Sequence, residues 1–175
     1  GTISMCAVVA STVQTKDSNY LGAIAGLNGA GGTIINCYAF LTKLVRIDSP
    51  AKAIGGITQQ NNGTVQYCHT YRCTFTGGSA DTDGILAGGN APSYCYYYTT
   101  SSISNNYNNA RTDADFNGGF VCYMLNSDQE LPVWGQFLGS QLYPVFGGNR
   151  VYYGYENCAD DAVAHYSNSV LYEVK

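Results

Sequence analysis

Charged side chains are scarce in this chain, and the few that it has do not gather. Asp, Glu, Lys and Arg make up 11% of the 175 residues, against roughly 25% in an ordinary globular domain. The eight Lys and Arg residues form no cluster and the formal net charge is −4. We therefore expect no nucleic-acid partner, because phosphate binding needs a concentrated cationic surface. No apolar run reaches the roughly 18 residues of a membrane span, so no membrane span is expected in this segment.

Groups suited to catalysis are few as well. The only histidines are His69 and His165, and no G-x-S-x-G motif is present. His69 follows a cysteine that is expected to point inward, so strand alternation predicts an outward, solvated His69. The acids, Asp81 and Asp83 among them, lie in polar turns, where solvated side chains are expected. A glycosidase needs two acids roughly 5–10 Å apart on one groove, and no such pair is apparent. We predict no enzyme activity, no catalytic residues and no cofactor.

What the chain has instead is a repeat. The segment Gly1–Cys6 returns at Gly32–Cys37 and again at Gly63–Cys68, with a period of 31 residues. A weaker copy ends at Cys95, 27 residues later. Internal repeats of this kind decide the fold, because equivalent segments stack on one another.

A second block of alternating small and apolar residues precedes the later copies. It occupies residues 23–28, 53–58 and 85–90 and is followed by turns rich in Gly and Asn, which tolerate positive φ. Each unit therefore reads as one coil of three short strands. We predict an all-β fold, a right-handed parallel β-helix (solenoid) of about four coils, with the handedness that parallel crossovers prefer. The expected division is 1–109 for the repeats and 110–175 for a mixed C-terminal cap.

The repeat position of the cysteines predicts a ladder of inward thiols. Cys6, Cys37, Cys68 and Cys95 share one position, in line with the inward residues Ile3, Ile34 and Val65. After the second of these cysteines, alternation points Ala39 and Leu41 inward. No C-x-x-C pair suggests zinc, and adjacent parallel strands offer poor disulfide geometry. We expect buried, stacked, reduced thiols; a local disulfide between Cys68 and Cys73 is the alternative.

Residues 110–175 leave the repeat pattern and are expected to close one end of the stack. The pattern predicts a helix over Gly119–Asn126 and a strand over Val151–Tyr153. Trp134 is expected in the core of this cap, with Cys122 and Cys158 buried. At the opposite end, Gly1 to Cys6 already has the form of a mature repeat, so we expect an open coil cut from a longer solenoid.

Two further patterns offer candidate binding residues. The first is a row of aromatics that alternation points outward, Tyr38, Tyr71, Tyr96 and Tyr98, which would stack sugar rings or anchor a protein; cross-strand packing is the alternative. The second is the pair Asp17 and Asp48, again 31 residues apart. These acids are expected to cap corners, with a calcium site as the weaker possibility, and no other metal site is expected.

The combined pattern A-I-A-G-L-N…G-T-I-I-N-C-Y, from Ala23 to Tyr38, resembles the GLUG motif. That motif occurs in large bacterial surface proteins, and the likeness covers roughly residues 1–104. The resemblance implies a non-catalytic extracellular repeat module at the cell surface, of adhesin or stalk type. Its partners would be a glycan, a protein or neighbouring repeats of the same parent chain. The alternatives are a carbohydrate-active β-helix enzyme, lyase or hydrolase, and a purely structural spacer.

Overall fold

The chain forms two compact units, Gly1–Ala110 and Arg111–Lys175. The computed structural model describes residues 1–16, 19–47, 52–98, 103, 107, 109–153, 162–165 and 171–174. Strands in parallel sheets dominate the first unit, and the second is a mixture of short helices and antiparallel strands. The all-β class with few helices is therefore as predicted.

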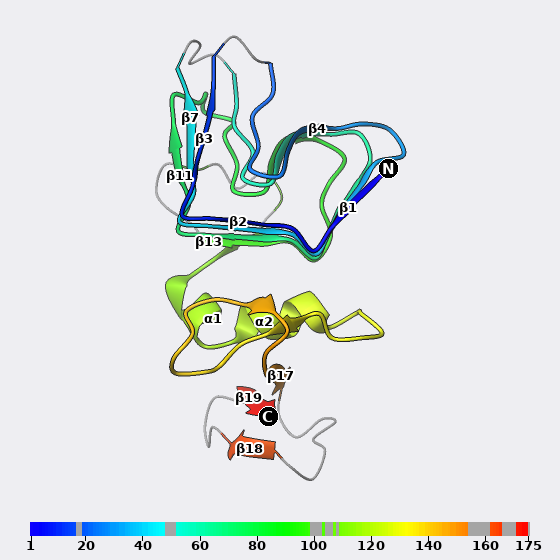
Figure 1. Ribbon diagram of the computed structural model, residues 1–175, viewed down its shortest axis with the longest axis vertical. Coiled ribbons are helices and arrows are strands. Elements are labelled where there is room, and N and C mark those ends of the chain that lie inside the picture. Colours follow the sequence, from blue (N-terminus) through cyan, green and yellow to red (C-terminus); the bar gives the residue numbers. More distant parts are fainter. Residues whose placement is uncertain are drawn as a thin grey trace. The chain divides into compact units, whose positions relative to one another are not determined.

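Each sheet of the first unit collects equivalent strands of successive repeats, so strands distant in sequence lie side by side (Figure 1). One sheet holds β1 (Thr2–Ser4), β5 (Thr33–Ile35) and β9 (Thr64–Gln66). The next holds β2 (Ala7–Val9), β6 (Tyr38–Phe40), β10 (His69–Tyr71), β13 (Tyr96–Tyr98) and β14 (Ala110–Arg111). The third holds β3 (Thr12–Thr15), β7 (Lys43–Arg46) and β11 (Thr74–Thr76). The fourth holds β4 (Ala25–Asn28), β8 (Thr58–Asn61) and β12 (Leu86–Gly89).

The hydrogen-bonded register confirms the 31-residue period over the first three sheets. Thr2 pairs with Thr33 and Thr33 with Thr64, all in parallel. The second block was aligned wrongly, because Asn28 pairs with Asn61, and Asn61 with Gly89. Each full repeat also has four strands where three were predicted. Small residues dominate this block, so its sequence fits several alignments and only the backbone bonds select one.

Two sharp corners in each repeat are made by non-glycine residues in the left-handed region. The first corner has φ near +51° at Met5, Asn36, Tyr67 and Tyr94; the second has φ of 47–51° at Ala10, Leu41 and Arg72. A side chain in this region costs roughly 1–2 kcal/mol. Leu41, predicted inward, is 49% exposed, and Thr42 is buried in its place. The corner resets the alternation, which is why the prediction for Leu41 was wrong.

The stack encloses two apolar clusters rather than one. The larger contains Ile34, Val65, the buried repeat cysteines and Tyr97, which was predicted inward and is 1% exposed. The smaller contains Leu21, Ala39, Leu44, Ile54 and Cys73. Asparagines join the repeats at the turn after the fourth strand. Asn28 Nδ2 donates to Asn61 Oδ1 (2.7 Å), and Asn61 Nδ2 donates to the Asn90 carbonyl oxygen (2.9 Å).

The first repeat is more exposed than the repeats stacked on it. Strands β1, β2, β3 and β4 all lie at sheet edges. Ile3 and Val8 are half-buried, whereas their partners Ile34 and Ala39 are at most 1% exposed.

The second unit begins with a capped helix. Helix α1 (Asp113–Asn117) starts at Thr112, which forms a reciprocal capping box with Asp115. Helix α2 (Phe120–Asn126) fits the helix predicted there, and β17 (Arg150–Tyr153) fits the predicted strand. Strands β15 (Trp134–Gly135) and β16 (Val145–Phe146) pair antiparallel. Strand β19 (Leu171–Val174) pairs antiparallel with β17 and with β18 (Ala162–His165).

The core of this unit includes two side chains that the sequence indicated. Trp134 is 1% exposed and its ring centroid lies 5.0 Å from that of Phe146. Cys122 is fully buried, as predicted, and Cys158 lies outside the described residues. Among the helices described, none has the length and apolar character needed to cross a bilayer.

Candidate functional site

The predicted thiol ladder is present, and its geometry shows what each thiol does. Cys37, Cys68 and Cys95 follow the left-handed residue of the first corner and are fully buried. Each Sγ donates to the carbonyl oxygen two residues earlier, at 3.1–3.3 Å. Each later thiol also accepts a backbone N–H from the preceding repeat, from Cys37 N to Cys68 Sγ (3.4 Å) and from Cys68 N to Cys95 Sγ (3.3 Å). The thiols therefore join the repeats as polar groups as well as filling the core.

Hydroxyls do the same at the second corner. Ser11 Oγ donates to the Val9 carbonyl oxygen (2.8 Å), and Thr42 Oγ1 donates to that of Phe40 (3.2 Å). Cys73 holds the equivalent position and is unpaired with Cys68, so the alternative of a local disulfide is wrong. Burial raises the pKa of Cys73 to about 11 and raises that of Cys68 well above the ordinary thiol value. These thiols are structural rather than nucleophilic.

Cys6 departs from the prediction for the ladder. It is a free thiol like the others but exposed, although its Sγ still donates to the Ser4 carbonyl oxygen (3.4 Å). The reason is its position in the edge strands of the first repeat, where the stack covers it on one side only.

The outward aromatics form two ring ladders along the second sheet. Tyr38 stacks on His69 with ring centroids 5.1 Å apart, and Phe40 stacks on Tyr71 at 6.0 Å. Tyr71 meets Tyr98 edge to face at 5.6 Å. Tyr38, Tyr71 and Tyr96 are at most 8% exposed, and Tyr98 is half-buried. Their binding role stays a prediction, and rings so covered offer little face to a sugar.

Two polar residues expected in solvent are buried. His69 is 0% exposed within its ring stack, because alternation gives the face of a strand but not whether that face is covered. Asp83 is 1% exposed, and its Oδ1 accepts the backbone N–H of Ile85 (2.8 Å). This carboxylate orders a turn and does not face solvent. Asp81, in contrast, is exposed as predicted.

The acids considered for calcium cannot be placed. Asp17 and Asp48 both lie outside the described residues. Within the part of the chain that the structure describes, no group of three or more His, Cys, Asp or Glu side chains is arranged to hold a metal ion.

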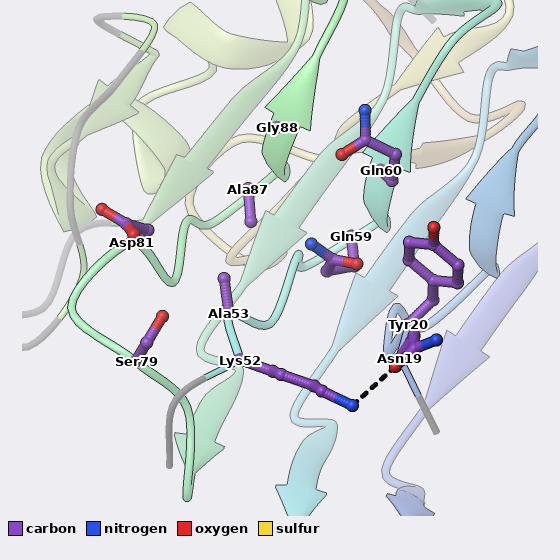
Figure 2. A pocket seen from close by; sticks show the side chains of 10 residues that line it. All are labelled: Asn19, Tyr20, Lys52, Ala53, Gln59, Gln60, Ser79, Asp81, Ala87 and Gly88. Carbon is purple, nitrogen blue, oxygen red and sulfur yellow. Dashed lines mark hydrogen bonds between the residues drawn. The ribbon is translucent and has the colours of Figure 1, made fainter. Parts of the chain in front are cut away.

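A polar groove lies where the connections after β3, β7 and β11 meet the sheet β4–β8–β12. It encloses about 410 Å³. Its lining residues come from all three repeats: Asn19, Tyr20, Lys52, Ala53, Gln59, Gln60, Ser79, Asp81, Ala87 and Gly88. Figure 2 shows Ser79 and Asp81 at one end, Asn19 and Tyr20 at the other, and Gln59 and Ala87 between them.

Backbone bonds between repeats hold the walls of this groove. The N–H of Ser79 donates to the carbonyl oxygen of Lys52 (3.0 Å), and the N–H of Gly55 donates to that of Leu21 (3.1 Å). The floor stays open because small residues stand beside the glutamines. A Cβ at Gly88 would lie 3.0 Å from Gln60 Oε1, so glycine is needed for this close approach.

The polar atoms of the groove are only partly used within the protein. Lys52 Nζ donates to Asn19 Oδ1 (2.6 Å), and Gln60 Nε2 donates to Asn62 Oδ1 (3.0 Å). Gln59 Oε1 is buried with no hydrogen-bond partner among the described residues. A buried acceptor without a donor costs roughly 1–3 kcal/mol. A ligand that supplied a donor, after a turn of this side chain, would recover that cost.

Sequence reasoning did not find this groove. Its residues come from five short segments and form no motif, and Ser79 and Asp81 were considered only as turn residues. The one signal was the repeat itself, since the corrected register places Gln59 between the small residues Gly26 and Ala87 of the neighbouring strands.

Comparisons of the chain with protein-family models, with curated proteins and with solved structures find no match in any of the three. The function is therefore argued from the geometry of the groove and of the stacked repeats.

Proposed function

We propose that the chain is a non-catalytic binding module of a bacterial surface protein that holds a glycan in the groove walled by Asn19, Lys52 and Asp81. The observation that carries the proposal is the lining of this groove. Amides, a hydroxyl, an ammonium and a carboxylate face one space. Such a mixture matches the many hydroxyls of a sugar, each of which both donates and accepts hydrogen bonds.

The shape of the groove supports an extended ligand. It spans three parallel repeats, which is roughly 10 Å at the spacing of neighbouring strands. That is on the scale of two linked sugar rings. Tyr20, 40% exposed at one end, offers the aromatic surface that sugar rings commonly pack against.

A binding role is favoured over hydrolysis by the carboxylates. Asp81 alone among the lining residues carries one, whereas paired-acid hydrolysis needs two on the same groove. Asp83 is engaged with a backbone N–H, and His69 is stacked on Tyr38. A lyase or hydrolase therefore remains the weaker alternative.

The finer description of the fold belongs to the same proposal. We infer a right-handed parallel β-helix of three full coils and part of a fourth, ended by the unit Arg111–Lys175 as a cap. The parallel registers and the two internal clusters support it. The resemblance to GLUG repeats supports an extracellular site and either an adhesin or a stalk; a spacer would bind nothing in the groove.

A glycan array followed by titration of the positive glycans tests this function. Ala87→Leu fills the groove and should abolish binding, whereas Ala30→Leu, at an exposed turn, should leave affinity unchanged. Gln59→Met should weaken binding while leaving the fold equally or more stable, because it removes a buried acceptor without a partner. No binding on the array, or binding that Ala87→Leu leaves intact, would refute the proposal.

A further inference from the structure

The negative charge of this chain is confined to one of its two units. Residues 111–175 carry eight Asp and Glu residues against three Lys and Arg, whereas residues 1–110 carry four against five. The unit with the groove therefore has a small positive formal charge. Its long-range field does not repel an anionic ligand, which a net charge of −4 for the whole chain would suggest.

Within the groove, one cation has no charged partner. Lys52 is half-buried, and its only printed contact, Asn19 Oδ1, is a neutral amide. No carboxylate pairs with this ammonium in the described part of the chain. An ammonium has three N–H donors, so two remain for a ligand. A hydrogen bond to a charged group is worth roughly 1.5–3 kcal/mol.

The opposite charge of the groove lies at its other end. Figure 2 shows the Lys52 side chain running toward Asn19 and Tyr20, with Asp81 and Ser79 at the far end. A bound anion next to Nζ would therefore be kept apart from Asp81. The carboxylate of Asp81 is placed to accept hydrogen bonds from hydroxyls.

We propose that the ligand of this groove is an acidic sugar chain whose carboxylate binds the Lys52 ammonium beside Asn19. Its ring hydroxyls bind the amides of Gln59 and Gln60 and the carboxylate of Asp81. This rests on the proposed glycan-binding function and adds to it the chemical class of the glycan.

The test compares matched acidic and neutral sugars by titration calorimetry. The probes are trisaccharides of galacturonic, glucuronic and sialic acid, each beside its carboxyl-reduced counterpart. Lys52→Met removes the charge and keeps most of the aliphatic stem. Lys43→Met is the matched control, because Lys43 is exposed on β7 and lies outside the groove lining.

We expect an acidic trisaccharide to bind about tenfold or more tightly than its reduced form, with a preference that weakens as salt rises. Lys52→Met should remove the preference and Lys43→Met should retain it. Equal binding of both forms, lost in Ala87→Leu, would overturn the acidic class and leave the glycan site standing. An acidic preference that survives Lys52→Met would overturn the assignment to Lys52. No binding of any sugar would overturn both proposals.

Discussion

Replacing Cys68 distinguishes a thiol that forms hydrogen bonds from one that merely fills space. Its Sγ donates to the Gln66 carbonyl oxygen (3.1 Å) and accepts the N–H of Cys37 (3.4 Å). Cys68→Ala leaves that N–H buried without an acceptor, at roughly 1–3 kcal/mol. It also opens a void the size of a methyl group, at roughly 1 kcal/mol. Cys68→Ala should therefore lower the free energy of unfolding by about 2–4 kcal/mol.

Cys68→Ser restores both bonds, as Thr42 and Ser11 do at the second corner, and should cost only about 1 kcal/mol. The predicted order of stability is Cys, then Ser, then Ala. A purely apolar role gives the reverse order for the two variants, because a hydroxyl without partners is costly in an apolar core.

Urea unfolding under reducing conditions measures these differences. Far-UV circular dichroism should be the probe, since the only tryptophan, Trp134, lies in the second unit and does not report on the repeats. Cys6→Ala and Cys6→Ser are the controls and should change stability little, because Cys6 is exposed. Finding Cys68→Ala as stable as Cys68→Ser, or more stable, would refute the reasoning.

Four further outcomes are expected from the same structure. Iodoacetamide on the native protein, followed by peptide mass spectrometry, should label exposed Cys6 and spare the buried repeat thiols, whose pKa values burial raises. Leu41→Val should destabilise the fold by about 1 kcal/mol and Leu41→Gly should be neutral or stabilising in urea unfolding, because φ is +48° there. Asn61→Leu should cost about 2–4 kcal/mol by the same assay, since it strands an N–H and a carbonyl oxygen. Stability should be constant below pH 9 and fall between pH 9 and 11, because an unfolded thiol ionises near 9.0 while burial raises the pKa of Cys73 to about 11; a flat profile across that range would contradict the burial.

How much the sequence predicts depends on which physical constraint a residue obeys. The segments ending in Cys6, Cys37 and Cys68 predicted their own pairing, because corner and thiol must coincide in every repeat. The block over residues 23–28 and 53–58 did not, since small residues pack acceptably in several registers.

Side-chain direction was predictable only as far as the backbone stayed extended. Tyr97 and Val65 point inward as alternation requires, but a left-handed residue at Leu41 shifts the alternation by one. Alternation also gives no information on what covers a face, and His69 is buried for that reason. The groove requires three connections to meet one sheet, and no local pattern encodes such a meeting.

The division of labour between corners and connections has a consequence for how recognition could change. The corner residues and ladders recur with a fixed spacing, whereas the connections over residues 16–24, 47–57 and 77–85 differ in length and sequence. Each connection contributes one or two groove residues, such as Asn19, Lys52 and Asp81. New specificity can therefore arise by exchanging connections while the stack stays intact, and adding a repeat would lengthen the binding surface by one strand spacing. A protein built this way is a ruler whose markings can be rewritten one at a time.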